Sequence, residues 1–274
     1  MKPVGVVGSL ALDLFPGAAP RPGGGPVYAA QALRALGRPG TLACKCGAAD
    51  RPELLLHLAT LGLPLRLIAG RTTTSFGFEY HGEERSLEVV AIGDPFTLDE
   101  AGGWVARALD RVEWVHVAPL LRSDFPVETL ERLARGRRLL YDGQGLVRVS
   151  ELGPLQLDDK FDPDLLRFIS MLKLSEEEAK VLVGDELEPS ALMELGVGEV
   201  VVTLGSRGSL VVAEGQAERI PATPIRGELD PTGAGDAFAI SYLVARSAGQ
   251  SPAAAARRAS AVVAGILAGR ARQG

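Results

Sequence analysis

The stretch 230-DPTGAGDAFAISYLV-244 joins a proline, two glycines and an aspartate to a long apolar run. Pro231 has a fixed φ and Gly233 allows a turn that other residues resist, so a helix is predicted to begin at Ala234. The first amides of a helix have no partners within it and carry a partial positive charge. Because no side chain from 233 to 235 is larger than a methyl group, a phosphate could reach these amides directly. The stretch therefore predicts either a phosphate-binding loop or an ordinary tight turn.

Asp236 lies in the first turn of this predicted helix. A carboxylate beside a phosphate is unfavourable unless it accepts a proton there, so Asp236 is a candidate general base. The helix N-terminus is expected to keep the pKa of Asp236 low, which still suffices for phosphoryl transfer because the hydroxyl proton leaves late. The alternative is that Asp236 only favours the helix start, since the loop matches neither GxxxxGK[ST] nor GxGxxG.

The composition indicates one large α/β domain. The 274 residues are 46% hydrophobic, but the apolar runs are strand-sized or interrupted, which predicts no transmembrane segment. The start, MKPVGVVGSLALDLF, is typical of a strand rather than a secretory signal, so we expect a cytoplasmic protein. Cys44 and Cys46 have no further cysteine partners, which favours reduced, buried thiols.

Two further features of the composition bear on function. The net charge is −5 and no basic cluster exceeds 135-RGRR-138, so nucleic-acid binding has no electrostatic support. The chain contains no asparagine and its cations are mostly arginine. Loss of thermolabile amides is typical of thermophile proteins, although a GC-rich genome biases composition in the same way.

Strand and helix signals alternate along the chain, which predicts a mainly parallel sheet with helices on both faces. Thr97 and Glu100 form a capping box ahead of one predicted helix, and Gly37 ends another. No linker or repeat divides the chain, so a single domain over 1–274 is predicted. The predicted helices are 26–36, 98–110 and 252–268. The predicted strands are 3–9, 41–47, 65–70, 113–119, 138–142, 169–174, 199–205 and 209–214.

One segment, 72–92, interrupts this alternation. Larger and smaller residues alternate in it, and 81–84 supply a turn, so a β-hairpin inserted in the domain is predicted. The larger residues are Thr74, Phe76, Phe78 and Tyr80. The hairpin is either an aromatic face packed on the body or a lid that closes over a ligand or pairs with another subunit.

Four stretches in a fixed order carry a resemblance to one family. They are 23-GGGPVYAAQALRALG-37, 173-KLSEEEAKVLVG-184, 200-VVVTLGSRGSLV-211 and 230-DPTGAGDAF-238. In the ribokinase-like carbohydrate kinases, the PfkB family, similar stretches are a Gly-Gly pair opening a helix, an Asn-x-x-Glu region, a strand-turn-strand beside the nucleotide, and the C-terminal signature. The resemblance covers nearly the whole chain. It implies a ribokinase-like α/β fold with a small hairpin lid, and a kinase that uses ATP and Mg²⁺, with a monovalent cation such as K⁺ as an optional activator.

The resemblance gives the C-terminal signature its roles. Asp236 would take the proton from the substrate hydroxyl. The amides of the first turn would form the anion hole for the migrating phosphoryl group. These are the amides of Gly233, Ala234, Gly235 and Asp236. Thr232 would lie beside the nucleotide phosphates.

Further positions match the nucleotide and metal regions of the family. Thr203, Gly205 and Gly208 would border the ATP, although a strand end and a hairpin turn explain these three residues equally well. Glu178 would help to order Mg²⁺ through water. Ser175 replaces the family's asparagine, as a chain without asparagine requires, and Ser175 with Glu178 is also a capping box.

The resemblance places substrate binding in the N-terminal half. Asp13 would hold substrate hydroxyls, and Gly23 and Gly24 would bring backbone close to the sugar. Tyr28 replaces another usual asparagine, which argues against a simple ribose-type site. The stretches 85-RSLEVVAIGDPF-96 and 139-LLYDGQGLVR-148 are more similar to inositol-kinase-like and uncharacterised sugar-kinase branches. Within the second stretch, Asp142, Gln144 and Arg148 either face the substrate or a phosphate, or merely end a strand with glycine turns.

The expected function is therefore phosphorylation of a hydroxyl on a sugar or polyol, by a monomer or by a homodimer formed through the hairpin. A nucleoside kinase is the close alternative, because Phe76, Phe78 or Tyr80 could stack on a base. A ligand sensor without activity is a third hypothesis, against which the intact Asp236 argues.

Overall fold

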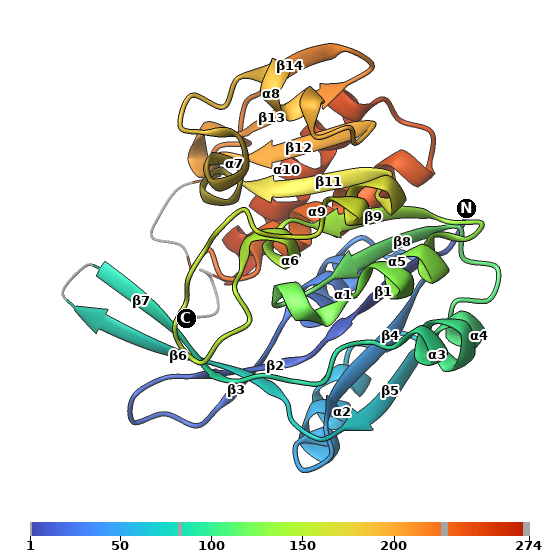
Figure 1. The fold of residues 1–274 in the computed structure, drawn as a ribbon, viewed down its shortest axis with the longest axis vertical. Coiled ribbons are helices and arrows are strands. Elements are labelled where there is room, and N and C mark those ends of the chain that lie inside the picture. Colours follow the sequence, from blue (N-terminus) through green and yellow to red (C-terminus); the bar gives the residue numbers. More distant parts are fainter. Residues whose placement is uncertain (1, 82–83, 226–229, 271–274) are drawn as a thin grey trace.

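The computed structural model describes residues 2–81, 84–225 and 230–270 (Figure 1). These residues form a nine-stranded sheet and a separate five-stranded sheet. In spatial order, the large sheet consists of β14 (Gln216–Ile220), β13 (Ser209–Ala213), β12 (Glu199–Thr203), β11 (Met171–Ser175), β9 (Arg138–Asp142), β8 (Trp114–Ala118), β1 (Val4–Ser9), β4 (Gly40–Gly47) and β5 (Leu65–Gly70). The strands from β12 to β5 are parallel, and β13 and β14 form an antiparallel edge.

Helices cover both faces of the large sheet, which confirms the predicted α/β fold. Successive strand residues point to opposite faces, so Leu42 and Cys44 of β4 join one hydrophobic core while Ala43 joins the other. The first core is covered by α1 (Gly25–Ala35), α2 (Arg51–Ala59), α9 (Ala234–Ser247) and α10 (Pro252–Arg270). On the other face lie α3 (Leu98–Glu100), η1 (Ala101–Val105), α4 (Ala106–Ala108), α5 (Val127–Ala134), η3 (Pro163–Phe168), α7 (Glu176–Val183) and α8 (Pro189–Glu194). The short turns η2 (Arg122–Asp124), α6 (Gln144–Val147) and η4 (Gly205–Arg207) follow strand ends.

The helix predicted over 98–110 differs most from its prediction. Its capping box is present, with the Glu100 amide donating to Thr97 Oγ1 at 3.2 Å. The segment then becomes a π-helix and ends at Ala108. Gly102 and Gly103 lie in the π-helical turn, and glycine has a low helix propensity, so the regular helix is weakest there.

The predicted hairpin is present, but it belongs to a larger sheet. The small sheet consists of β10 (Gly153–Pro154), β7 (Glu84–Ala91), β6 (Thr74–His81), β2 (Ala11–Leu14) and β3 (Arg21–Gly23). β6 and β7 are antiparallel, and β6 also pairs with β2 in parallel. The expectation of a one-hairpin lid was therefore incomplete, because β2, β3 and β10 are too short to give a pattern in the sequence. Residues 82 and 83 of the predicted turn lie outside the described residues.

The aromatic face of the hairpin packs on the body. Phe76 and Phe78 are buried in a core with Ala11, Leu120 and Leu121, and Phe78 stacks on Phe15 with ring centroids 4.9 Å apart. The side chain of Tyr80 lies outside the described residues. Since Leu120 and Leu121 follow β8, the small sheet lies at the carboxyl end of the parallel strands.

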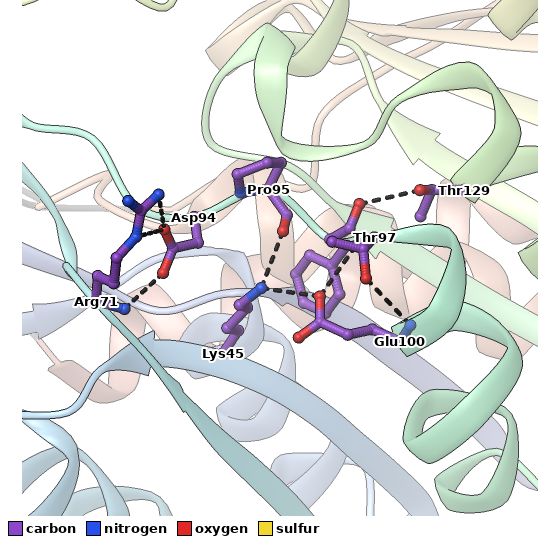
Figure 2. A network of polar contacts seen from close by, with 8 residues as sticks. Lys45, Arg71, Asp94, Pro95, Thr97, Glu100 and Thr129 are labelled. Carbon is purple, nitrogen blue, oxygen red and sulfur yellow. Dashed lines mark hydrogen bonds and ion pairs between the residues drawn. The ribbon is translucent and has the colours of Figure 1, made fainter.

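Residues 71–73 join the hairpin to β5 of the large sheet, and residues 92–97 join it to α3. Figure 2 shows the polar network that holds these two connections. The buried Lys45 of β4 donates its Nζ to the Pro95 carbonyl at 2.9 Å and to Glu100 Oε2 at 2.8 Å. Arg71 bridges to Asp94, with Nε 2.8 Å from Oδ1. Three backbone amides of this region donate to side chains instead of to strand partners. They are Gly47 to Thr73 Oγ1, Arg71 to Asp94 Oδ2, and Gly93 to Thr74 Oγ1.

Two smaller findings concern thiols and membranes. Cys44 and Cys46 are free and buried, as predicted. Among residues 2–81, 84–225 and 230–270, no helix has the length and apolarity that crossing a membrane requires.

Candidate active site

The loop before α9 has the predicted turn at Gly233. Gly233 has φ 73°, in the left-handed region, and α9 begins at Ala234. A Cβ at Gly233 would lie 2.1 Å from Cδ1 of Tyr28, so the tyrosine ring leaves room only for glycine. Of the four amides predicted to form an anion hole, that of Ala234 donates to the Pro231 carbonyl at 2.9 Å in this structure.

The amides of Gly235 and Asp236 have no backbone acceptor among the described residues. They are the first-turn donors of α9 that remain available to an anion. An anion hole at this turn stays a prediction.

Asp236 lies in the first turn of α9, next to the N-terminus of α1. The residue is partly exposed, but its Oδ1 is inaccessible and has no hydrogen-bond partner within the described part of the chain. A Cβ at Gly25 would lie 2.8 Å from this oxygen, so α1 approaches the carboxylate closely only because it begins with glycine. A buried carboxylate oxygen without a partner is costly in a fold and needs a functional explanation.

Burial, together with the nearby Asp142, raises the pKa of Asp236 to about 7 against the opposing effects of Lys173 and Arg148. The expectation of a low pKa was therefore wrong. A helix N-terminus lowers the pKa of a carboxyl group only by a local effect, whereas α1 and the strand ends remove the carboxylate from water. Asp236 thus has a pKa close to neutral pH, as suits a general base.

An ion pair that the sequence analysis missed lies beneath the first turn of α9. Lys173 of β11 and Asp142 of β9 are directly opposite each other in the parallel pairing, and Lys173 Nζ lies 3.3 Å from both carboxylate oxygens. Both side chains are buried. A Cβ at Gly235 would lie 3.0 Å from Lys173 Nζ, so the ammonium lies against this turn.

The charge of Lys173 is maintained despite its burial. Burial lowers the pKa of the ammonium, but Asp142, Glu178 and Asp236 raise it more, so that its pKa stays above the ordinary value. A positive charge is therefore fixed beside the amides of Gly235 and Asp236. A lysine between the apolar residues Leu172 and Leu174 of the predicted strand 169-ISMLKL-174 was the signal that could have revealed this pair.

Glu178 forms the predicted capping box with Ser175. The Glu178 amide donates to Ser175 Oγ at 3.2 Å, and Glu178 Oε2 accepts from the Ser175 amide at 2.8 Å. Glu178 is buried close to Gly143, since a Cβ there would lie 3.3 Å from its Oε2. Its contact with a metal through water stays a prediction.

A cleft of about 500 Å³ lies at the carboxyl ends of β11 and β12. Its lining includes Thr203 and Gly205, two of the residues expected to border ATP, and the lining residues are Ser175, Glu176, Glu177, Lys180, Thr203, Leu204 and Gly205. Gly208 is not among the residues that line the cleft. A Cβ at Gly208 would be 1.9 Å from the Ile220 carbonyl oxygen, so only glycine fits against the backbone at that point. Thr232 is also outside the lining, and its carbonyl accepts from Arg270 Nη1 at 2.7 Å.

The expected substrate residues meet near Asp236. Asp13 is buried and lies over Gly23, where a Cβ would be 2.7 Å from its Oδ2. Gly24 has φ 90°, and a Cβ there would lie 2.9 Å from the Ser9 carbonyl oxygen, so the turn before α1 requires glycine. The next residue, Gly25, is the one that lies against Asp236, so this turn stands beside the first turn of α9.

Tyr28 contacts the loop rather than an open space. Its ring packs on Gly233, and the Arg270 guanidinium lies 5.8 Å from the ring centroid. Burial raises the pKa of its hydroxyl, and Asp13 and Asp236 raise it further, which indicates that both carboxylates are close. Tyr28 thus supports the loop, and its contact with substrate stays a prediction.

The comparisons with known proteins agree with this geometry. The model of the pfkB family carbohydrate kinases matches residues 18–270, and the chain therefore belongs to the PfkB family of carbohydrate kinases. Members of this class are phosphotransferases, so the chain is an enzyme that transfers a phosphoryl group.

Two relatives show what the chain is similar to in sequence. The ATP-dependent 6-phosphofructokinase isozyme 2 of Mycobacterium tuberculosis strain H37Rv is 29% identical over 275 residues, which cover 91% of this chain and 75% of the relative. The cytidine kinase of Thermococcus kodakarensis is 38% identical over 96 residues, which cover 32% of this chain and 34% of the relative.

Solved structures share the fold at lower identity. A pyrophosphate-dependent kinase of the ribokinase family, complexed with a pyrophosphate analog and myo-inositol, has a TM-score of 0.80 at 23% identity and covers 96% of this chain and 94% of its own. The ribokinase of Arabidopsis thaliana, complexed with ribose and ATP, has a TM-score of 0.76 at 21% identity and covers 97% of this chain and 92% of its own.

Gly233→Ala is expected to lower kcat at least about 100-fold, because the new methyl group must displace the Tyr28 ring and so move the first-turn amides that are predicted to bind the phosphoryl group. Steady-state kinase assays measure this loss. Gly17→Ala is the matched control, since Gly17 has a similar φ of 71° with nothing within 4 Å of a Cβ. Equal losses of kcat in the two variants would show that backbone strain, rather than the position of the amides, is responsible.

Proposed function

We propose that the chain uses ATP to phosphorylate a hydroxyl group of a sugar or polyol, with an inositol-like acceptor included in that class. Asp236 is the general base. The observation that carries the proposal is its inaccessible Oδ1, which lies without a hydrogen-bond partner among the described residues at the first turn of α9. The neighbouring amides and the Lys173 ammonium supply positive charge for a transferred phosphoryl group.

Each part of the site has a separate role in this proposal. Asp13, with the close backbone of Gly23 and Gly24, holds the acceptor so that one hydroxyl lies beside Asp236. Asp236 accepts the proton of that hydroxyl, and the oxygen attacks the terminal phosphorus of the donor in line with the leaving oxygen. The cleft at Thr203 and Gly205 receives the rest of the nucleotide.

Mg²⁺ fits this arrangement when the nucleotide supplies most of its ligands. Within residues 2–81, 84–225 and 230–270, no group of three His, Cys, Asp or Glu side chains could hold a metal ion. Mg²⁺ commonly keeps several waters and uses one or two carboxylates together with substrate phosphates, and Glu178 is the residue proposed to act through water. Bound Mg²⁺ would neutralise charge on the donor phosphates. K⁺ is proposed as an optional activator, so the assays are run with and without it.

A nucleoside kinase is the second candidate, because one relative is a cytidine kinase. A base could stack on Phe76 or Phe78 only if that ring left its present contact. Phe78 stacks on Phe15, and Arg148 lies over Phe76. The packing of Phe76 and Phe78 therefore argues against base stacking on these two rings, and the side chain of Tyr80, the third candidate, lies outside the described residues.

Turnover with a panel of donors and acceptors tests the proposed function. The donors are ATP and pyrophosphate, with and without K⁺, and the acceptors are myo-inositol, ribose, fructose, fructose 6-phosphate, adenosine and cytidine. ATP with a sugar or polyol should give the highest kcat/KM. A preference for a nucleoside would refute the acceptor class, and a preference for pyrophosphate would refute the donor. A complete lack of turnover would favour the ligand sensor.

The activity is expected to fall as the pH decreases through neutrality. Only the ionised carboxylate can accept a proton, and burial raises the pKa of Asp236 to about 7. The kcat/KM for the acceptor should therefore lose about tenfold for each pH unit below that pKa, and should level off above it. A pH profile of initial rates at saturating ATP measures this. A profile that stays flat down to about pH 5 would indicate an ordinary carboxyl pKa.

The proposed setting is cytoplasmic, with ATP and a small molecule as partners and no nucleic acid. The assembly is proposed to be a monomer or a homodimer formed through the hairpin of β6 and β7. Val90 on β7 is 46% exposed, so the hairpin offers an apolar residue to such a contact. Size-exclusion chromatography with light scattering distinguishes the two assemblies.

A further inference from the structure

Arg148 follows α6 at the carboxyl end of β9, on a segment that is firmly held. Its amide donates to the Gln144 carbonyl at 2.9 Å, and its carbonyl accepts from the Arg122 amide at 3.0 Å. The Arg122 side chain donates to carbonyls on both sides of this segment, including Leu146 at 2.8 Å and Asp158 at 2.9 Å. The position of Arg148 is therefore fixed by the fold.

The other polar residues of the stretch 139–148 are engaged by the protein. Asp142 pairs with Lys173, and the buried Gln144 donates its Nε2 to the Pro119 carbonyl at 2.6 Å. Arg148 differs from both, because no described residue accepts a hydrogen bond from its guanidinium. The group is partly exposed and lies over the ring of Phe76, 5.9 Å from the ring centroid.

This guanidinium lies close to the base. Arg148 is one of two cations that lower the pKa of Asp236, and the other, Lys173, is already engaged by Asp142. Phe76 comes from the small sheet and Asp236 from α9, so Arg148 lies where the lid meets the reacting groups. A planar group with five donors in such a place is suited to bind two oxygens of a ligand.

The charges around this place select the ligand. Asp13 is paired with Phe76 in the small sheet, and the Arg148 guanidinium lies over the Phe76 ring. Asp13 also lies over Gly23, and Asp236 lies against Gly25, so a ligand between these groups meets two carboxylates and one guanidinium. A hydroxyl group can donate to a carboxylate and accept from a guanidinium. A phosphate dianion can only accept hydrogen bonds, so it could use the Arg148 guanidinium but neither carboxylate.

We propose that Arg148 binds the acceptor substrate beside Asp236, and that this acceptor is an uncharged polyhydroxy compound rather than a sugar phosphate. The proposal rests on the proposed kinase function and adds a recognition residue and a substrate class to it. Neighbouring hydroxyls of the acceptor accept from the Arg148 guanidinium, and other hydroxyls donate to Asp13 and Asp236. Phe76 holds the guanidinium in place from the side of the lid.

Steady-state kinetics of Arg148→Gln, Arg148→Lys and the control Arg138→Gln test the proposal, with the uncharged acceptors and fructose 6-phosphate from the panel above. Arg138 also lies over an aromatic ring, that of Trp114 at 5.1 Å, but it stands at the amino end of β9, away from the site. The KM for the acceptor should rise roughly 10- to 100-fold in Arg148→Gln, as expected for loss of a hydrogen bond from a charged group. The KM for ATP should stay within about twofold. Arg148→Lys should lie between wild type and Arg148→Gln, and Arg138→Gln should match wild type.

Thermal melting of each variant shows whether the fold is intact, and Arg148→Lys retains the charge if Arg148→Gln melts early. An unchanged acceptor KM in Arg148→Gln would overturn the proposal, as would a higher kcat/KM for fructose 6-phosphate than for every uncharged acceptor. Either result would leave the kinase function standing. A lack of turnover with all acceptors would overturn the kinase function and this inference with it.

Discussion

Asp236→Asn is expected to lower kcat by about three orders of magnitude, with the binding of ATP and acceptor nearly unchanged. The carboxylate is the proposed proton acceptor, and an amide of the same shape cannot replace it. The inaccessible Oδ1 has no partner among the described residues, so the substitution breaks no recorded hydrogen bond. Rates under saturating conditions measure the loss, and isothermal titration calorimetry measures the retained binding.

Asp99→Asn is the matched control, because Asp99 lies in the first turn of α3, at an exposed position outside the site. Its kcat should equal that of the wild type. Equal kcat values for Asp236→Asn and wild type would remove Asp236 from the mechanism.

Asp236→Asn is expected to lower kcat but not the stability of the fold. Burial raises the pKa of Asp236 to about 7, above the value of about 3.9 for an unfolded chain, so the folded state retains the proton over this window. The contribution of Asp236 to stability is therefore lost as the pH rises from about 4 to 7. Asp236→Asn should melt at the same or a higher temperature than wild type at neutral pH, and this advantage should vanish at acid pH.

Lys173→Met is expected to lower the free energy of unfolding by about 3–5 kcal/mol. The substitution leaves the Asp142 carboxylate buried, with its nearest cation removed. Breaking a buried ion pair from one side is strongly destabilising because the remaining charge is no longer compensated. Urea unfolding monitored by circular dichroism measures the change.

Two controls separate the loss of the buried ion pair from the effect of replacing any lysine by methionine. Lys180 pairs with Glu176 at 3.1 Å in a more exposed place, and Lys180→Met should cost at most about 1 kcal/mol. The double variant Lys173→Met/Asp142→Leu removes both charges and should recover most of the lost stability. Equal costs for Lys173→Met and Lys180→Met would mean that the buried pair has no special importance.

The large sheet could be predicted from the sequence because its strands are long enough to show a pattern. Runs such as 199-EVVVT-203 are apolar and bounded by glycine or polar residues, which is the pattern of strands buried on both faces. The strands β2, β3 and β10 have two to four residues, so their pairing depends on tertiary contacts. The π-helical turn after Glu100 likewise has no reliable pattern of its own.

The glycine-rich loop could also be predicted, because the conformation of Gly233 and the start of α9 are local properties. The pairing of Lys173 with Asp142 joins residues 31 positions apart, and the sequence around either residue does not indicate which residue is its partner. The error in the pKa of Asp236 has the same origin. The helix N-terminus was visible in the sequence, but the surfaces that bury the carboxylate come from α1 and β9.

The side-chain bonds at the base of the hairpin have a consequence for hydrogen exchange. The amides of Gly47, Arg71 and Gly93 donate to Thr73, Asp94 and Thr74, so each can exchange only when a connection of the hairpin separates from its neighbour. Amides within β6 and β7 are bonded to each other and stay protected if the hairpin moves as one body. The two groups of amides therefore distinguish a rigid movement of the hairpin from its local unfolding.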